Sequence, residues 1–137
     1  MSTKSPDTYQ QIHATAIEIN GIAVLLQGAP GSGKSDLALR LIEEGAMLIA
    51  DDRVDIIKID GQVCASSPSS INGFMEVRGV GVLKMGSATN IPVGLLVQLV
   101  SGSAIERLPD PEYDQLLNHK IKVIKIEPFS VSASAFF

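Results

Sequence analysis

The fold of this chain is decided by Gly28-Ala29-Pro30-Gly31-Ser32-Gly33-Lys34-Ser35, which matches the phosphate-binding template GxxxxGK(S/T). Glycines let the backbone of such a loop turn with positive φ and bring several N–H groups toward one anion, where a bulkier side chain would block it. Lys34 adds a positive charge, and Ser35 is placed to hold the magnesium ion that accompanies nucleotide phosphates. The stretch therefore predicts a site for a nucleotide and magnesium.

The residues on either side of this loop predict a strand before it and a helix after it. Residues 22–26 are apolar at every position, which is typical of a central strand covered on both faces. A helix is expected over residues 33–44, with its apolar side chains on one stripe and Gly45 as the left-handed residue that ends it. A strand, a glycine loop and a helix in this order favour a real phosphate loop over a chance match to the template.

The remainder of the chain shows mainly strand and turn signals. Asn20-Gly21 and Asp60-Gly61 are strong signals for two-residue hairpin turns. Residues 107–114 are polar and contain prolines, and we expect a helical turn from there through Asn118. Alternating or apolar stretches predict strands at residues 12–19, 47–50, 54–59, 62–65, 75–83, 93–100 and 121–126, the last as an edge strand guarded by lysines. The expected fold is an α/β domain with a phosphate loop (P-loop), a helix after it, and a mixed sheet with antiparallel hairpins.

Length and composition indicate a single globular domain. With 137 residues, 45% of them hydrophobic and 19% charged, the chain is long enough for one core and lacks the composition of a disordered protein. We expect residues 1–11 to form a flexible leader and residues 12–137 to form one P-loop domain. No apolar run approaches the roughly 18 residues that a membrane span needs. A net charge of -4 argues against a nucleic-acid surface.

Cysteine usage points to a reducing compartment. The single Cys64 excludes an internal disulfide, and the start of the chain lacks the apolar core of a secretory signal. We therefore expect a cytoplasmic protein. In its Val-Cys-Ala context, Cys64 is more typical of a small buried filler than of a reactive thiol.

A pair of acidic residues follows the strand predicted at residues 47–50. Phosphoryl transfer needs a group that takes the proton from the acceptor hydroxyl, a contribution of about 10²–10⁴-fold. Asp51 and Asp52 are the leading candidates, because their carboxylates should emerge at the carboxyl edge of the sheet, where α/β proteins place ligands. Neighbours on an extended chain point to opposite sides, so we expect one to face the phosphate and the other to brace the loop. A surface turn held by ion pairs is the alternative.

Three further residues are weaker candidates on pattern alone. Glu76 and Arg78 share one face if their segment is extended, so they could serve a metal ion and a phosphate, but on pattern alone a solvent-facing pair on a half-exposed strand is favoured. His13 lies near the start of a predicted strand, where a lone histidine is more often a hydrogen-bonded structural residue than a catalyst.

Together these motifs resemble the catalytic domain of the HPr kinase/phosphorylase family, bacterial enzymes that phosphorylate a serine of the phosphocarrier protein HPr. The resemblance rests on His13 before an apolar hairpin, on residues 28–35, on LIADDRV at residues 48–54 and on MEVRGVG at residues 75–81. Their order and spacing hold over about residues 12–84, which is more than half of the chain. Many kinases have the glycine loop, whereas the last two motifs together are nearly particular to this family.

The resemblance implies the ligands of the site. Residues 28–35 would bind the phosphates of ATP, with Lys34 on phosphate and Ser35 on Mg²⁺. Glu76 would help to bind the metal. The implied cofactors are ATP and Mg²⁺, and the implied partner is an HPr-type phosphocarrier in regulation of the phosphotransferase system.

The resemblance also implies catalytic roles. Asp51 would be the base that activates the acceptor serine, Asp52 would support it, and His13 would lie close to the transfer centre. In the family the same aspartate also works in reverse for phosphorolysis, so that one site removes the group that it adds.

The chain departs from the family pattern in several places. Asp36 stands where the family usually has Glu, a conservative change for a carboxylate near magnesium. The loop at residues 84–91 is shorter than usual and contains no arginine, which weighs against phosphorolysis more than against kinase activity. There is no room before His13 for the family's separate N-terminal domain, so we expect a short form reduced to the kinase core. The usual basic helical extension at the end is missing, which leaves the homo-oligomeric state open.

Two other functional interpretations stay open. A small-metabolite kinase could use the same loop, but such kinases usually need a lid and a pocket from additional helices, and this chain is mostly strands after Gly45. A non-catalytic nucleotide sensor, on which the phosphocarrier docks, is the other alternative, and the shortened loop favours it. The preferred hypothesis is an ATP-dependent serine kinase that acts on HPr or a paralogue.

Overall fold

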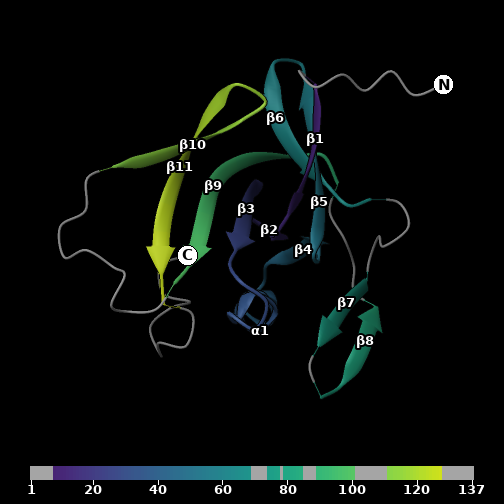
Figure 1. Ribbon diagram of the computed structural model, residues 1–137. Coiled ribbons are helices and arrows are strands. Elements are labelled where there is room, and N and C mark those ends of the chain that lie inside the picture. The colour runs from purple at the N-terminus through teal and green to yellow at the C-terminus, as the bar shows by residue number, and fades with distance from the viewer. Residues whose placement is uncertain (1–7, 69–73, 78, 85–88, 101–110, 128–137) are drawn as a thin grey trace.

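The computed structural model describes residues 8–68, 74–77, 79–84, 89–100 and 111–127 (Figure 1). The elements in chain order are β1 (Tyr9–His13), β2 (Thr15–Ile19), β3 (Ile22–Gln27), α1 (Lys34–Glu43), β4 (Met47–Ala50), β5 (Arg53–Ile59), β6 (Gln62–Ser66), β7 (Phe74–Val77), β8 (Gly81–Lys84), β9 (Ile91–Leu99), β10 (Glu112–Leu116) and β11 (His119–Ile126). Within these residues, no helix has the length and hydrophobicity that crossing a membrane would require.

The main strands form two layers, and α1 covers one face of the larger layer. The larger layer holds β4, β2, β3, β9, β11 and β10 in that order, and the smaller one holds β1, β5 and β6. β9 belongs to both, because Ile91 and Pro92 pair with β6 while the residues after them pair with β3 and β11. Figure 1 shows this strand as a long curved arrow. β7 and β8 form a separate hairpin.

Residues 23–26 of β3 are buried on both faces, as the apolar run predicted, whereas Ile22 at the start of the strand is 48% exposed. Val24 and Leu26 pack in the same cluster as Leu37 of α1. Ala23 and Leu25 belong to a second cluster, which includes residues of β5 and β6. Because successive side chains of a strand point to opposite faces, this one strand joins the two cores. The phosphate loop starts at the end of that doubly covered strand.

α1 begins and ends within one residue of the predicted bounds. Its last turn closes on Gly45, whose φ is 114°. The N–H of Ala46 donates to the carbonyl of Leu41 at 3.0 Å, and the N–H of Gly45 donates to the carbonyl of Ile42 at 3.0 Å. These two bonds are the Schellman arrangement, in which a glycine in the left-handed region satisfies the last carbonyls of a helix. The prediction that Gly45 ends the helix is confirmed.

The strand directions bring the ends of several strands to one edge of the larger layer. β3, β9 and β11 are parallel. β4 runs in the same direction, because β4 and β3 both pair antiparallel with β2. The loop after β3 and the turn after β4 therefore leave the sheet at the same edge, beside the start of β2. Ligands of α/β sheets bind at this carboxyl edge.

The segment predicted as one strand at residues 12–19 is two strands in different layers. β1 pairs with β5, whereas β2 pairs with β3 and β4, so the chain changes layer at Ala14. The first strand also begins at Tyr9, which corrects the expectation of a flexible leader through residue 11. Pairing with β5, far along the chain, orders residues 9–11, and local composition cannot show such a partner. Residues 1–7 of that leader lie outside the described residues.

Two expectations for the last strands are wrong. Residues 112–118 form β10 and a tight turn, because Leu117 and Asn118 have φ of 49° and 66° and reverse the chain into β11. The helical turn predicted there does not occur, and residues 107–110 lie outside the described part of the chain. β11 is an interior strand between β9 and β10. Its exposed Lys120 and Lys122 alternate with buried residues, so they mark a solvent-facing side of the strand and not an open edge.

The other turn and strand predictions are confirmed except at residues 75–83. Asn20 and Gly21 have φ of 52° and 82°, and Asp60 and Gly61 have φ of 51° and 78°, as two-residue hairpin turns require. The strands expected at residues 47–50, 54–59, 62–65 and 93–100 correspond to β4, β5, β6 and β9. The single strand expected at 75–83 is wrong, because β7 and β8 pair antiparallel with each other and Gly79, with φ of 83°, lies between them.

Cys64 is a buried residue of β6, as its sequence context indicated. Its side chain is 4% exposed and forms no disulfide. Burial, reinforced by the negative charge of Asp60, raises the pKa of its thiol. Because the thiolate is the reactive form, a thiol held protonated in this way is a poor nucleophile. The interpretation of Cys64 as a structural filler is confirmed.

A buried carboxylate of β5 binds two side chains of β1, its neighbour in the smaller layer. Asp55 of β5 is 9% exposed, and its Oδ1 accepts hydrogen bonds from the hydroxyl of Tyr9 and from Nε2 of Gln11, both at 3.0 Å. Burial raises the pKa of Tyr9, and the hydrogen bond to Asp55 and the charge of Asp55 raise it further. Because the pKa is raised in the folded protein, the stabilisation is present below the ordinary value of 10.0 and is lost as the pH rises through the folded pKa.

We predict that Tyr9→Phe lowers the free energy of unfolding by about 1 kcal/mol at neutral pH, because it removes one hydrogen bond to a buried carboxylate. Urea unfolding at neutral pH and at about pH 11 should show this difference shrink at the higher pH, because Tyr9 ionises more readily in the unfolded chain than beside Asp55. Tyr113→Phe is the matched control, since Tyr113 is 58% exposed, and it should change neither value. A difference that stays constant between the two pH values would contradict the assignment.

Candidate active site

The glycine loop at residues 28–35 leaves β3 and turns directly into α1. Gly31 and Gly33 have φ of 79° and 98°, a region in which glycine carries no steric penalty. Between them the N–H of Ser32 donates to the carbonyl of Ala29 at 2.9 Å, which closes the turn. The expectation that the loop needs positive φ at glycines is confirmed at these two positions.

Gly28 is required for a different reason, which is close approach. Its φ is not in the left-handed region, but a Cβ at this position would overlap the Ser32 hydroxyl and lie 3.2 Å from the Cβ of Leu99. Leu99 is the last residue of β9, which runs parallel to β3. The loop is therefore set against the neighbouring strand at its first residue.

The start of α1 presents backbone donors to the space inside the loop. Gly33 is the N-cap and adds no side-chain cap, while its carbonyl accepts the N–H of Leu37 at 2.9 Å. The N–H groups of Lys34, Ser35 and Asp36 have no carbonyl partner within the helix. Together with the positive end of the helix dipole, they form an anion site of the kind that holds phosphate. The Asp36 side chain, in the first turn, is exposed.

Two side chains of the loop fit an anionic ligand. Lys34 Nζ donates to the carbonyl of Gly28 at 2.8 Å, so the ammonium group lies across the loop. The hydroxyl of Ser32 is buried and has no hydrogen-bond partner among the described residues. A buried hydroxyl of this kind is normally satisfied, and phosphate oxygens would satisfy it. The cradle thus has the charge and the donors that a nucleotide phosphate needs.

The structure brings the first residue of the acidic pair to the loop. Oδ1 of Asp51 accepts a hydrogen bond from Ser35 Oγ at 3.3 Å and another from Thr15 Oγ1 at 2.9 Å. Asp51 is half-buried, whereas the neighbouring Asp52 is exposed. The two carboxylates therefore differ in environment. A carboxylate beside the serine of the glycine loop could take a proton from an acceptor near the bound phosphates.

The turn that carries this pair is strained. Asp52 has φ of 72°, and the N–H of Arg53 donates to the carbonyl of Asp51 at 2.9 Å. A bond between residues two apart around a positive φ defines the rarer, strained form of the γ-turn. The N–H of Ala14 donates to the Asp52 carbonyl at 3.0 Å and fixes the turn from outside. Strained backbone of this kind concentrates at functional sites, where surrounding structure maintains it.

For the three other predicted site residues, His13, Glu76 and Arg78, the structure gives fewer contacts. His13 ends β1, is exposed, and lies opposite Arg53 in the register with β5, so it borders the strained turn. Glu76 lies in β7, opposite Val82 of β8, and β7 contacts α1. Arg78 lies outside the described residues.

The described residues suit magnesium bound together with a nucleotide. No group of three or more His, Cys, Asp or Glu side chains that could hold a metal occurs in the part of the chain that the structure describes. Magnesium at nucleotide sites takes one or two protein ligands and completes its shell with phosphate oxygens and water. Ser35, with Asp51 at 3.3 Å, supplies a partial set of this kind.

Sequence reasoning missed one residue of the site, Thr15. The signal was present, because Thr15 is a polar residue among apolar neighbours at the start of a strand. Its side chain is 1% exposed, and a buried hydroxyl must find a partner. The sequence could have indicated that Thr15 needs a hydrogen-bond partner, but only the pairing of β2 with β4 identifies this partner as Asp51.

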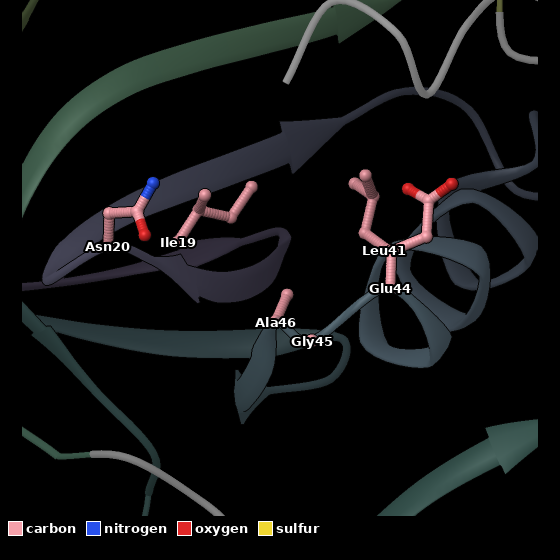
Figure 2. Close-up of a pocket in the computed structure, with 6 residues that line it drawn as sticks. All are labelled: Ile19, Asn20, Leu41, Glu44, Gly45 and Ala46. Carbon is pink, nitrogen blue, oxygen red and sulfur yellow. The ribbon is translucent and has the colours of Figure 1, made fainter.

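A surface hollow of about 270 Å³ lies at the other end of the helix (Figure 2). Its lining comes from the β2–β3 turn and from the end of α1, namely Ile19, Asn20, Leu41, Glu44, Gly45 and Ala46. A helix of 10 residues is about 15 Å long, so the hollow is separated from the glycine loop by the whole helix. It is therefore no part of the candidate active site.

Comparison with known sequences identifies one family. The model of the HPr Serine kinase C-terminal domain matches residues 6–131. An HPr kinase/phosphorylase of Clostridium kluyveri is 33% identical over 133 residues, which cover 89% of this chain and 42% of the relative. That of Clostridium beijerinckii is 43% identical over 79 residues, covering 58% of this chain and 26% of the relative. The chain thus spans less than half the length of these curated relatives.

A solved structure shows the same fold. The HPr(Ser) kinase/phosphatase of Coxiella burnetii superimposes with a TM-score of 0.82 at 26% sequence identity, over 92% of this chain and 83% of that chain. The prediction of a P-loop α/β domain with a mixed sheet is confirmed by this likeness and by the strand order.

We predict that Gly28→Ala raises the dissociation constant for magnesium ATP by about tenfold or more, equivalent to about 1.4 kcal/mol. The reason is steric, since the new methyl group would displace Ser32 or Leu99 and open the cradle. Isothermal titration calorimetry measures the constant.

The matched control is Gly21→Ala. Unlike Gly28, Gly21 has a positive φ, 82°, with nothing within 4 Å of an added Cβ, and it lies in the β2–β3 turn, away from the loop. This variant should lose stability and keep its ATP affinity. Equal losses of affinity in both variants would show that general destabilisation, and not loop geometry, controls binding.

Proposed function

The chain belongs to the HPr Serine kinase C-terminal domain family, and on that premise we propose that it is an ATP-dependent serine kinase acting on HPr or a close paralogue. The observation that carries the proposal is the hydrogen bond of 3.3 Å between Ser35 and Asp51. It joins the residue that would hold magnesium to the residue that would take the proton. A kinase of this type would act in the cytoplasm, in regulation of the phosphotransferase system.

The glycine loop would hold the triphosphate. Lys34 would leave the carbonyl of Gly28 and pair with phosphate oxygens, and the N–H groups at the start of α1 would donate to the same anion. Ser35 would hold Mg²⁺ together with the phosphates, and Glu76 from the β7–β8 hairpin would complete the protein ligands. Bound magnesium neutralises the charge of the reacting phosphoryl group. Asp36 and Arg78 would act around this centre, Asp36 as a carboxylate near the metal.

Asp51 would act as the general base. The serine oxygen of the acceptor attacks the γ-phosphorus in line, a bond forms between that oxygen and phosphorus, and the bond from phosphorus to the ADP oxygen breaks. The serine proton passes to the carboxylate of Asp51. Asp52 would hold the turn in shape, and His13 would border the acceptor.

The reverse reaction is a separate question for the same site. In phosphorolysis, inorganic phosphate would give a proton to Asp51 and attack the phosphorus of phosphoserine. A bond from the phosphate oxygen to that phosphorus would form pyrophosphate, the bond from phosphorus to the serine oxygen would break, and Asp51 would pass the proton to that oxygen. The segment of residues 84–91 contains no arginine to assist the incoming phosphate. We therefore expect the forward reaction to be the stronger of the two.

We predict that the wild-type protein, incubated with magnesium ATP and a bacterial HPr, adds one phosphate to a serine of HPr, as mass spectrometry will show. Asp51→Asn should lower the rate by about 10²–10⁴-fold, because the amide cannot accept the proton. The ATP affinity should stay within about threefold of wild type, since phosphate binding rests mainly on the glycine loop.

Asp60→Asn is the matched control for this substitution. Asp60 is exposed in the β5–β6 turn with φ of 51°, a conformation that Asn adopts equally well, so this variant should keep full activity. ATP binding without any transfer to HPr would reject the kinase and favour a nucleotide sensor. Transfer to a sugar or an amino acid in place of HPr would favour a small-metabolite kinase, and full activity of Asp51→Asn would refute the assignment of the base.

A further inference from the structure

We propose that Thr15 is a positioning residue, whose buried hydroxyl fixes the carboxylate of Asp51 beside the glycine loop. The inference rests on the proposed function for its kinetic consequence, because Asp51 must be the base for its orientation to matter to the rate. The hydrogen bond itself can be tested without any catalysis.

The hydrogen bond between Thr15 and Asp51 is partly buried and short. Thr15 is 1% exposed, and its Oγ1 donates to Oδ1 of Asp51 at 2.9 Å. A buried hydroxyl without a partner would destabilise the fold, so this residue type at this position is explained by the carboxylate. The bond is shorter than the 3.3 Å from Ser35 to the same oxygen. When Ser35 turns toward a metal ion, the Thr15 bond would still hold Oδ1 of Asp51.

Thr15 is also held on a rigid element. It is the first residue of β2, an interior strand that pairs with β3 on one side and with β4 on the other. β3 delivers the glycine loop and β4 delivers Asp51, so Thr15 stands on the strand between the two halves of the site (Figure 1). A side chain fixed from a paired strand holds a functional group more tightly than a loop residue does.

The residue before Thr15 fixes the same turn through the backbone. The N–H of Ala14 donates to the carbonyl of Asp52 at 3.0 Å. Ala14 and Thr15 thus hold the strained turn at two successive residues, one by its main chain and the other through the side chain of Asp51. The main-chain bond can form whatever side chain stands at position 14, whereas the second bond requires a hydroxyl at position 15.

The test compares Thr15→Val, which keeps the shape and removes the hydroxyl, with Thr15→Ser, which keeps the hydroxyl. With HPr as acceptor, Thr15→Val should lower kcat by about 10–100-fold and leave the KM for ATP within about twofold, because a misplaced base slows transfer without weakening phosphate binding. Thr15→Ser should restore kcat to within about threefold of wild type. Wild-type kcat in Thr15→Val, or an equal loss in Thr15→Ser, would overturn the inference.

A stability cycle decides the question even if the protein has no kinase activity. The urea midpoints of wild type, Thr15→Val, Asp51→Ala and the double variant are measured without ligand. If the two side chains interact, the double variant should shift less than the sum of the two single shifts, because either change already breaks the bond. Additive shifts would overturn the inference. Non-additive shifts, in a protein that fails to phosphorylate HPr, would support the contact and reject the proposed function separately.

Discussion

Coverage of β3 on both faces is the constraint on which the rest of the structure depends. Val24 and Leu26 face α1, while Ala23 and Leu25 face the smaller layer, and none of the four is more than 5% exposed. A strand buried in this way cannot slide by one residue without exchanging its two faces. The end of β3 therefore has a defined position, and so does the glycine loop that follows it.

Because β3 and β4 run in the same direction, the segments that follow them lie together and form the candidate site. β4 runs with β3, so the acidic turn after β4 lies at the same edge as the glycine loop. β2 runs against both, so its first residue, Thr15, also lies there. Three parts of the chain that are separate in sequence thus meet through strand order alone. The strained φ of 72° at Asp52 is maintained by the bond from Ala14, at the point where the chain changes layer.

Signals from neighbouring residues predicted the glycine loop and the helix, but they could not predict how distant strands pair. The glycine loop, α1 and the Gly45 cap follow from residue types that act on their own neighbours, and they were predicted within one residue. The break at Ala14 could not be predicted, because alternation has the same period in both layers. The order of β9, β11 and β10 depends on pairing between distant segments, and the lysines of β11 indicated an edge that another strand covers. The link between Thr15 and Asp51 had to come from the structure for the same reason.

The close approach of Gly28 to Leu99 also bears on when the glycine loop takes its final shape during synthesis. A nascent chain that has left the ribosome only as far as α1 already contains the complete phosphate template. It still lacks β9, the strand against which the loop is set, and the parallel pairing of β3 with β9 joins segments far apart in the sequence. Pairing of this kind forms late in folding. The cradle proposed for ATP is therefore complete only after β9 has paired, and a ligand that binds only this native arrangement would stabilise it by mass action.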